Sequence, residues 1–233
     1  MKIIGYIYTD FSEKFGIPRQ SGLVKGLRGK IVFEPKYRVS EAVKGLEEYS
    51  HLWLLWKFSG AEREDWSATV RPPRLGGKKR MGVFATRSPF RPNPIGLSCV
   101  SLERIEYDET LGPVIYVRGV DMLNKTPIYD IKPYLSYCDS HPEAKCGFAD
   151  KVKDHALVVQ CEAVVPQEMD EEELETIFEI LRQDPRTAYL EDEQRVWGIT
   201  YGAYNVKFVV CKEQLRILEI KEDRRVESDT AEE

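Results

Sequence analysis

The sequence predicts a mainly β protein, with an N-terminal β-barrel followed by a small α+β domain. Short runs of β-branched and aromatic residues recur between turn residues through the first part of the chain, a spacing typical of a barrel or sandwich. The charge balance then changes sign, because residues 1–160 carry 25 Lys and Arg against 19 Asp and Glu, whereas residues 161–233 carry 9 against 20. We expect a barrel domain at 1–165, an α+β domain at 166–220 and a disordered tail at 221–233.

The strands expected in the first part are short runs rich in β-branched or aromatic residues. Between the second and third of them, Ser40 can cap a helix whose apolar face includes Val43 and Leu46, so a single helix is expected over 40–49. The expected strands are 3–8, 28–33, 51–58, 82–86, 98–105, 113–120 and 155–164.

The α+β domain is expected to begin with a helix. Asp170 can cap it, three glutamates fill its first turn, and the apolar residues Leu174, Ile177 and Leu181 recur at helical spacing. The expected strands that follow are 195–201, 203–210 and 215–220, the first two joined tightly at a glycine.

Several signatures are missing from the sequence. It has no Gly-x-Gly-x-x-Gly after a strand and no P-loop, which argues against a Rossmann dinucleotide site and against a P-loop nucleotide site. The five cysteines include no Cys-x-x-Cys pair and the three histidines are scattered, so we expect reduced core thiols and no metal site. No apolar run is long enough to span a membrane, and cytosol is the expected compartment.

A proline-rich loop is the most informative stretch of the chain. Over residues 82–98, three prolines fix the backbone and aim the side chains of Arg87, Arg91 and Asn93 at small entropic cost. A rigid display of polar groups of this kind indicates a ligand-binding loop.

The same stretch lies within a basic segment. From Trp66 to Leu102 there is no Asp or Glu, whereas a surface made only for solubility would mix both signs. Phosphate responds to such a local field even though the whole chain has a net charge of −5, so a nucleic acid is an expected partner. The basic residues of the segment are Arg71, Arg74, Lys78, Lys79, Arg80, Arg87 and Arg91.

Four separated motifs carry a family resemblance. They are FGIPRQ at 15–20, HLW at 51–53, the proline-rich stretch at 82–97 and TPIYDIKPY at 126–134. In this order they resemble the TsaA-like (TrmO) family of S-adenosylmethionine-dependent tRNA methyltransferases. Further along, Asp-Pro-Arg at 184–186, followed by Ala188 and Tyr189, is similar to the C-terminal extension of the longer, bacterial-type members.

The resemblance implies a β-barrel methyltransferase outside the Rossmann class, working as a homodimer with S-adenosylmethionine near the subunit interface. The implied reaction methylates N6 of the adenosine at position 37 of threonine tRNA, where the base already carries an N6-threonylcarbamoyl group. Asn124 and Lys125 stand where the family more often has Asp-Gly. The cofactor residues that the resemblance implies are Pro18, Arg19, Gln20, His51, Leu52, Arg87, Leu97, Asn124, Lys125, Thr126 and Pro127.

A second set of residues is expected to contact the tRNA. RNA loops are gripped through their backbone charge, and their bases are splayed onto stacking side chains such as Trp66. Arg91 and Lys132 could also pair with the threonyl carboxylate of the substrate base. The expected substrate residues are Arg71, Arg74, Lys78, Lys79, Arg80, Arg91, Asn93 and Lys132.

The implied chemistry needs close approach and exclusion of water rather than a metal. Because the carbamoyl group acidifies the N6 proton, a hydrogen-bond acceptor can suffice to remove it, and Asp130 is the expected acceptor. Asp121, Asp130 and Lys132 flank one polar turn, however, and the alternative to a functional role is a structural ion pair. Two further classes stay open: an RNA-binding barrel of the OB type without a cofactor, and a protein that senses S-adenosylmethionine without transferring its methyl group.

Overall fold

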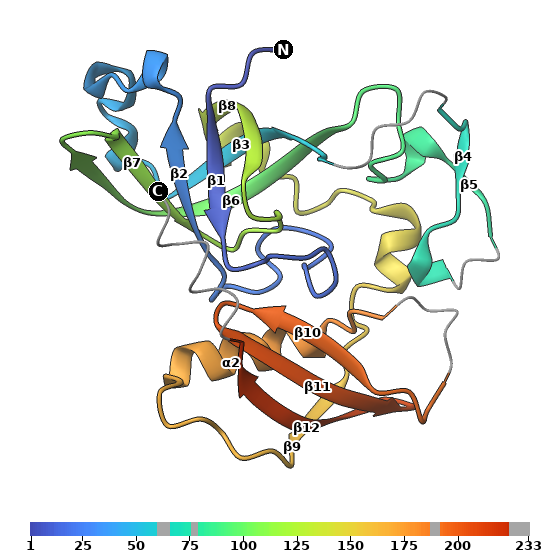
Figure 1. Ribbon diagram of the computed structural model, residues 1–233. Helices are drawn as coiled ribbons and strands as arrows, with labels where there is room; N and C mark the ends of the chain where they lie inside the picture. The colour runs from blue at the N-terminus through green and yellow to red at the C-terminus, as the bar shows by residue number, and fades with distance from the viewer. Residues whose placement is uncertain (60–65, 76–78, 187–191, 224–233) are drawn as a thin grey trace.

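The computed structural model describes residues 1–59, 66–75, 79–186 and 192–223, apart from the side chain of Arg74. A closed barrel lies above a second, four-stranded sheet in Figure 1. The predicted fold class, mainly β with an N-terminal barrel, is therefore confirmed. No helix in these ranges is long and apolar enough to cross a membrane.

Six strands close the barrel, and each pairs antiparallel with its two neighbours. In order around the barrel they are β1 (Gly5–Thr9), β2 (Arg28–Phe33), β7 (Gly112–Arg118), β6 (Ile95–Asp108), β3 (His51–Lys57) and β8 (Thr126–Pro133). Alternate residues face inward, so that on β3 the side chains of Leu52, Leu54 and Trp56 are buried. The residues between them face the outside of the barrel.

Residues 40–49 form two short 3₁₀ turns rather than the single helix that the sequence predicts. The turns span Ser40–Val43 and Leu46–Glu48, after an earlier turn at Pro35–Tyr37. Gly45 separates them with φ 83°, a left-handed conformation that interrupts a helix. The helix prediction was wrong because the apolar spacing was given more weight than this glycine.

Two further segments differ from the expectation. Over 82–86 only Gly82 is in a strand, because β5 (Met81–Gly82) pairs with β4 (Thr69–Val70) and a 3₁₀ turn follows at Val83–Ala85. Strand β8 was not expected, since prolines are rare inside paired strands. Its two prolines are its second residue, Pro127, and its last, Pro133, where the lost N–H groups interrupt the ladder least.

The second sheet is built around a capped helix. Helix α2 (Glu171–Arg182) begins at Asp170, whose carboxylate accepts the backbone N–H of Glu173 at 2.7 Å, while the Glu173 carboxylate accepts that of Asp170 at 3.1 Å. This helix prediction is confirmed. The sheet has the order β10 (Trp197–Tyr201), β11 (Tyr204–Cys211), β12 (Gln214–Glu222) and β9 (Val158–Cys161).

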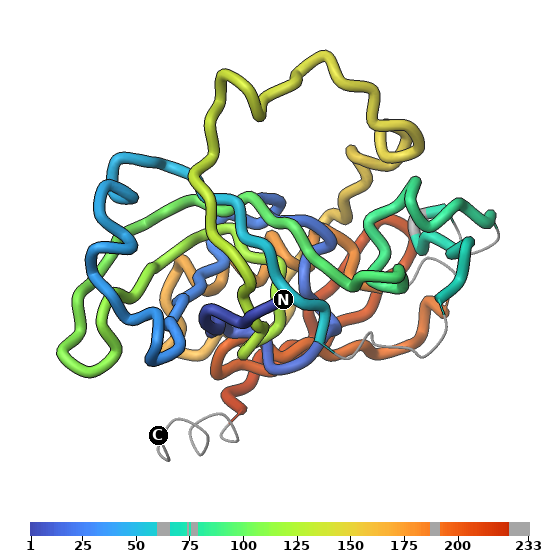
Figure 2. The backbone as a smooth tube through the Cα atoms, turned by 90° about the horizontal axis from the view of Figure 1, so that it is seen from above, coloured from blue at the N-terminus to red at the C-terminus, as the bar shows by residue number. Residues whose placement is uncertain are grey.

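Strand β9 pairs in parallel with β12, so the strand expected at 155–164 belongs to the second sheet and not to the barrel. Strand β12 extends to Glu222, into the segment expected to be a tail, and residues 224–233 lie outside the described part. The connection from β8 to β9 arches outside the barrel in Figure 2 and contains α1 (Ser136–Asp139) and a 3₁₀ turn at Gly147–Lys151.

The cysteines are free thiols, but they are not core residues as the sequence suggested. Cys99 is half-buried on the outer face of β6, and the other four are exposed. Burial, followed by the nearby charge of Asp139, raises the pKa of the Cys99 thiol. Composition indicated the absence of disulfides, but the depth of each thiol depends on strand register, which composition does not reveal.

Candidate functional site

Three residues that the resemblance assigns to the cofactor form one hydrogen-bonded chain. The Arg87 guanidinium donates to the side-chain oxygen of Gln20, and the Gln20 amide donates to the backbone carbonyl of Arg19. Arg87 is exposed, whereas Arg19 and Gln20 are half-buried. The contact joins residues 18–21, which we call the cofactor loop, to residues 86–94, which we call the proline loop.

The proline loop is held by its own hydrogen bonds. The Thr86 hydroxyl donates to the Val83 carbonyl at 2.9 Å and accepts the Ser88 N–H at 3.3 Å, and the Arg91 guanidinium donates to the Thr86 carbonyl at 3.3 Å. Asn93 is exposed at its far end. The arginine that the sequence assigned to substrate therefore also closes the loop on itself.

A half-buried carboxylate lies next to the cofactor loop. Asp121 accepts the Ser98 hydroxyl at 2.6 Å, and Ser98 in turn accepts the indole N–H of Trp56 at 2.9 Å. The backbone N–H of Ser21 also reaches the Asp121 carboxylate. Burial raises the pKa of Asp121 to about 6. The Ser98 hydroxyl, the backbone N–H groups of Asp121 and Ser21, and the charge of Arg87 oppose this shift.

The sequence explains this arrangement locally. Gly96 lies directly beneath the Trp56 ring, where any Cβ would collide with the indole, so only glycine lets Trp56 lie against β6 and reach Ser98. The Ser21 hydroxyl accepts the Cys99 N–H at 3.1 Å, which holds the cofactor loop along the same strand. The sequence analysis grouped Asp121 with Asp130 and Lys132, but Asp121 contacts Ser98 and Ser21, whereas Asp130 pairs with Lys132.

The turn at 124–127 is anchored to the end of β1. Asn124 accepts the Thr9 N–H on its side-chain oxygen at 3.2 Å and donates its own N–H to the Phe11 carbonyl at 2.9 Å. The buried Thr126 hydroxyl donates to the Leu123 carbonyl at 2.6 Å. Lys125 adopts φ 60°, a left-handed conformation that suits the glycine more common here in the family.

Other implied cofactor residues lie elsewhere on β3 and β6. His51 is exposed, with its ring nitrogens 2.9 Å from the Ser50 hydroxyl and 3.2 Å from the Ser101 hydroxyl. Leu97 is 52% exposed on the outer face of β6, whereas Leu52 and Pro18 are buried, Leu52 completely and within the barrel core. Of these residues, His51 borders an open groove of about 570 Å³, which is lined by His51, Trp53, Cys99, Tyr134, Asp139, Ser140, His141 and Pro142.

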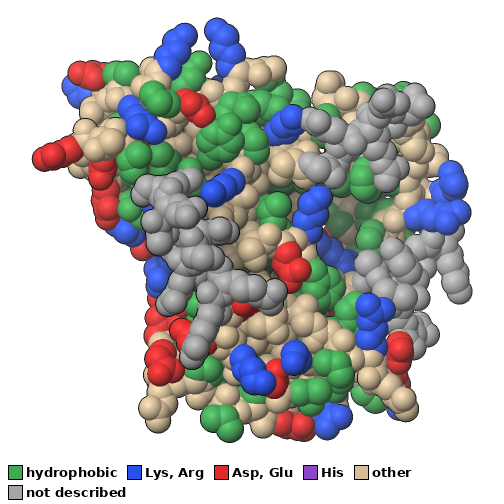
Figure 3. Space-filling model, in the orientation of Figure 1, with side chains coloured by type: hydrophobic (Ala, Val, Ile, Leu, Met, Phe, Trp, Pro, Cys, Tyr) green, Lys and Arg blue, Asp and Glu red, His purple; other side chains and the backbone are tan. Residues whose placement is uncertain are grey.

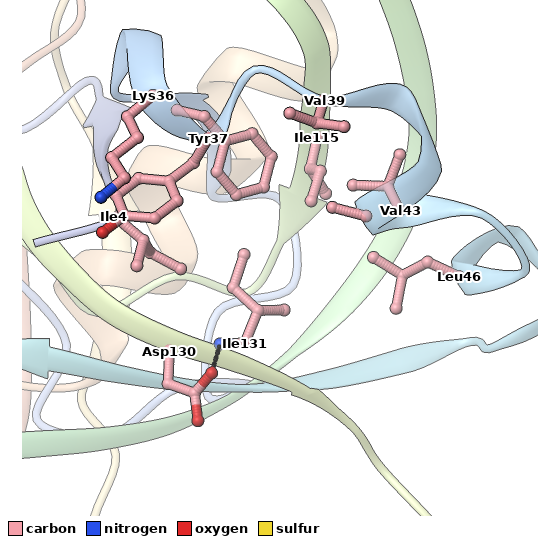
Figure 4. Close-up of a pocket in the computed structure, with 11 residues that line it drawn as sticks. Ile4, Lys36, Tyr37, Val39, Val43, Leu46, Ile115, Asp130 and Ile131 are labelled. Atoms are coloured by element: carbon pink, nitrogen blue, oxygen red, sulfur yellow. Dashed lines mark hydrogen bonds between the residues drawn. The ribbon is translucent and has the colours of Figure 1, made fainter.

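Asp130 lies apart from this chain of contacts. Its carboxylate accepts the Ile131 N–H at 3.0 Å and forms an ion pair of 3.3 Å with Lys132, and both side chains are about half exposed. It borders a pocket of about 290 Å³ whose other lining is mostly apolar, including Tyr37 and Leu46, and in Figure 4 the carboxylate points away from these apolar side chains. No contact of the described residues joins Asp130 to Arg87 or Asp121.

The basic segment presents exposed cations on a hairpin. Arg71, Lys79 and Arg80 are exposed on the β4–β5 hairpin, and Arg80 donates to the Thr69 hydroxyl at 3.0 Å. Blue Lys and Arg side chains line this edge in Figure 3. Lys78 and the side chain of Arg74 lie outside the described part.

The basic segment also carries two exposed aromatic rings that lie close together. Trp66 is 52% and Phe84 71% exposed, and their ring centroids are 5.9 Å apart. The sequence analysis named Trp66 but missed Phe84, which lies within the expected strand at 82–86. Within the described ranges no group of three or more His, Cys, Asp or Glu side chains could hold a metal ion.

Comparison with known proteins extends these observations. The family model described as the tRNA-methyltransferase O N-terminal domain matches residues 6–140, and the TrmO C-terminal domain matches residues 154–223. The tRNA (adenine(37)-N6)-methyltransferase of Escherichia coli is 40% identical over 215 residues, which cover 89% of this chain and 91% of that protein. A putative S-adenosylmethionine-dependent methyltransferase of Pseudomonas aeruginosa is 41% identical over 205 residues, 85% of each chain.

A solved structure agrees with these matches. The crystal structure of TrmO from Pseudomonas aeruginosa superposes with a TM-score of 0.71 at 31% identity, covering 94% of this chain and 97% of that one. The closed barrel, the basic β4–β5 hairpin (the basic hairpin) and the contact between the cofactor loop and the proline loop, together with these matches, define the class of β-barrel tRNA methyltransferases. The chain belongs to the tRNA-methyltransferase O family.

Proposed function

We propose that this chain transfers a methyl group from S-adenosylmethionine to N6 of N6-threonylcarbamoyladenosine at position 37 of threonine tRNA. Membership of the family makes it an S-adenosylmethionine-dependent tRNA methyltransferase. The carbamoylated base and the threonine tRNA are the finer part of the proposal. The observation that carries the methyl-transfer part is the contact of Arg87 with Gln20 beside the half-buried Asp121.

The residues at this contact fit S-adenosylmethionine chemically. Its methionine end carries a carboxylate, which the exposed Arg87 guanidinium can bind, and its adenine edge offers partners for an amide such as Gln20. Its sulfonium is a cation, for which the charge of Asp121 is favourable. When bound, the cofactor supplies an electrophilic methyl group.

The chain's own residues then orient the reacting groups. The proline loop and the cofactor loop fix Arg87 and Gln20, and the Asp121 hydrogen bonds hold the cofactor loop along β6. We keep Asp130 as the proposed acceptor of the N6 proton, with the Lys132 ammonium 3.3 Å from its carboxylate. Lys132 or Arg91 would pair with the threonyl carboxylate.

The tRNA is proposed to bind along the basic hairpin. Trp66 and Phe84 form an exposed aromatic pair beside Arg71, Lys79 and Arg80, which suits an RNA loop whose phosphates are neutralised while its bases stack. An acidic second part of the chain does not oppose this, because binding follows the local field. We place this chemistry in the cytoplasm, where tRNA is modified.

The experiment that tests this function is methylation of tRNA by the purified chain, followed by digestion and mass spectrometry. We expect tRNA from cells lacking the enzyme to gain one methyl group, on N6 of the modified adenosine 37. A chain that binds S-adenosylmethionine but methylates no tRNA would instead be a sensor. Binding of RNA without binding of the cofactor would leave a non-catalytic barrel.

Charge reversal on the basic hairpin should weaken tRNA binding. Changing Lys78, Lys79 and Arg80 together to Glu removes three cations of the basic segment, so affinity should fall at least about tenfold for all tRNAs alike, and the salt dependence of binding should become shallower. Filter binding at several salt concentrations measures both. Affinity for S-adenosylmethionine should not change, and a variant that retains full tRNA affinity would place the RNA on another face.

The assembly is proposed to be a homodimer. The outer face of β3 and β6 exposes Leu97 and carries the groove lined by His51 and Cys99, and the family resemblance places the cofactor near a subunit interface. Light scattering of dilute protein should give twice the mass of 26.9 kDa. A monomer that binds the cofactor with full affinity would show that one chain completes the site.

A further inference from the structure

The Asp-Pro-Arg turn at the end of α2 is a stiff structure. The Arg186 guanidinium donates twice to the Asp184 carboxylate, at 2.8 and 3.0 Å, and the two side chains are only 15% and 14% exposed. His155 approaches the same carboxylate at 3.3 Å. Pro185 fixes its own backbone angle, and Asp184 takes φ 50°, which a side-chain-bearing residue adopts only where its surroundings enforce it.

The charge state of the turn is also fixed. Burial alone would raise the pKa of Asp184, but the hydrogen bonds and charge of Arg186, together with the contact from His155, hold it below its ordinary value. The turn follows directly from α2, since the Asp184 N–H donates to the Leu181 carbonyl at 3.1 Å, and Leu181 is fully buried. The turn is therefore tied to the core of the second sheet.

This turn contacts the cofactor loop. The Arg19 guanidinium donates to the backbone carbonyl of Arg186 at 3.0 Å and lies 3.5 Å from that of Asp184. These two carbonyls belong to the residues whose side chains lock the turn. The Arg19 carbonyl in turn accepts the Gln20 amide N–H, and the Gln20 side-chain oxygen accepts a hydrogen bond from Arg87.

The residues just before the cofactor loop, 11–16, also contact the second sheet. Phe15 stacks on Trp197 with ring centroids 5.7 Å apart, and Phe11 meets Tyr201 edge-on at 5.5 Å. Gly16, with φ 100°, lies so close to Ile199 that an added Cβ would be 3.3 Å from it. The second sheet thus supports the approach to the cofactor loop as well as its arginine.

We propose that the Asp184–Arg186 turn is a positioning element that fixes Arg19 and, through it, the Gln20–Arg87 pair of the cofactor site; this rests on the proposed function of that site. The turn itself does not touch the cofactor. It limits the orientations of Arg19, so that the donors of the cofactor loop are in place before the ligand arrives, which lowers the entropic cost of binding. The second sheet is accordingly part of the binding apparatus.

The test is a double-mutant cycle read by calorimetry with S-adenosylmethionine. Arg186→Ala should weaken cofactor binding about tenfold, and Arg186→Lys, which keeps the charge but loses the paired donors, should rescue only part of it. In an Arg19→Ala background, Arg186→Ala should cause little further loss of affinity, because both changes interrupt the same chain of contacts from the turn to Gln20 and Arg87. The matched control is Arg182→Ala, which removes an exposed pair with Glu175 on the same helix end and should leave affinity unchanged.

Two results would overturn the proposal: wild-type affinity in a folded Arg186→Ala variant, or losses from Arg19→Ala and Arg186→Ala that simply add. Circular dichroism and thermal melting report whether each variant folds. If Arg186→Ala does not fold, Asp184→Asn takes its place in the same cycle with the same expected coupling. A wild-type chain that binds no S-adenosylmethionine would be a different failure, that of the proposed function itself.

Discussion

Replacing Arg87 by Ala is expected to weaken binding of S-adenosylmethionine by more than tenfold while the protein stays folded. Arg87 is an exposed guanidinium held toward the cofactor loop by Gln20, so its removal costs no core packing. A hydrogen bond to a charged group contributes about 1.5–3 kcal/mol, equivalent to roughly 10- to 150-fold in affinity. Calorimetry on purified protein measures the change.

The control for this change is an arginine that is equally exposed but far from the site. Arg104 lies on β6, pairs with Glu106 at 2.6 Å and covers the Tyr116 ring. Arg104→Ala should leave cofactor affinity unchanged. If Arg87→Ala behaves in the same way, Arg87 anchors the proline loop and does not bind the cofactor.

Replacing Asp121 by Asn should separate stability from function. The substitution keeps an oxygen that can accept from Ser98 and Ser21, but it removes the negative charge beside Arg87. We expect affinity for S-adenosylmethionine at pH 8 to fall about tenfold. The unfolding temperature at pH 8 should nevertheless rise, because an ionised carboxylate is no longer buried.

The pH dependence of stability follows from the direction of the shift. Folding raises the pKa of Asp121 from 3.8 to about 6, so the folded state holds this proton more tightly than the unfolded chain. That contribution is complete below about pH 4 and is lost as the pH rises through about 6. The ionised group therefore costs on the order of 3 kcal/mol at pH 8. Because Asn must bury an amide in its place, the expected gain is about 1–2 kcal/mol.

The matched control is Asp130→Asn, which changes the other carboxylate that the proposed function uses. Asp130 is half exposed and should change stability little, whereas loss of the proposed proton acceptor should lower the rate of methyl transfer without changing cofactor affinity. In the wild type, cofactor affinity should decline below about pH 6, and only Asp121→Asn should remove that decline. An unaltered decline in Asp121→Asn would assign it to another group.

The sequence predicted the barrel and the helix at α2 because their signals are local. Alternating strands and a capped amphipathic helix are visible in one segment at a time, as for 28–33 and for the helix that begins after Asp170. Strand β8 was missed because Pro127 and Pro133 mask it. Strand β9 was placed in the wrong sheet because its partner, β12, is more than 50 residues further along the chain.

The candidate site was predicted in part. Arg19, Gln20 and Arg87 were named from motifs, and the structure brings them together. The partial burial of Asp121 could not be inferred from the sequence. It depends on a contact with Ser98 on β6, which in turn accepts from Trp56 on β3. The contact of Arg19 with the Asp184–Arg186 turn is equally nonlocal. A polar side chain in a turn gives no sign of burial until its tertiary partners are known.

The central claim, methyl transfer to a carbamoylated adenosine, is tested most directly with two matched threonine tRNAs that differ only in the N6-threonylcarbamoyl group. Each is incubated with the purified chain and S-adenosylmethionine, and its digest is analysed by mass spectrometry. We expect methylation only of the carbamoylated tRNA, because the carbamoyl group acidifies the N6 proton and its threonyl carboxylate gives a cation of the site an anion to bind. Equal methylation of both tRNAs would contradict the account.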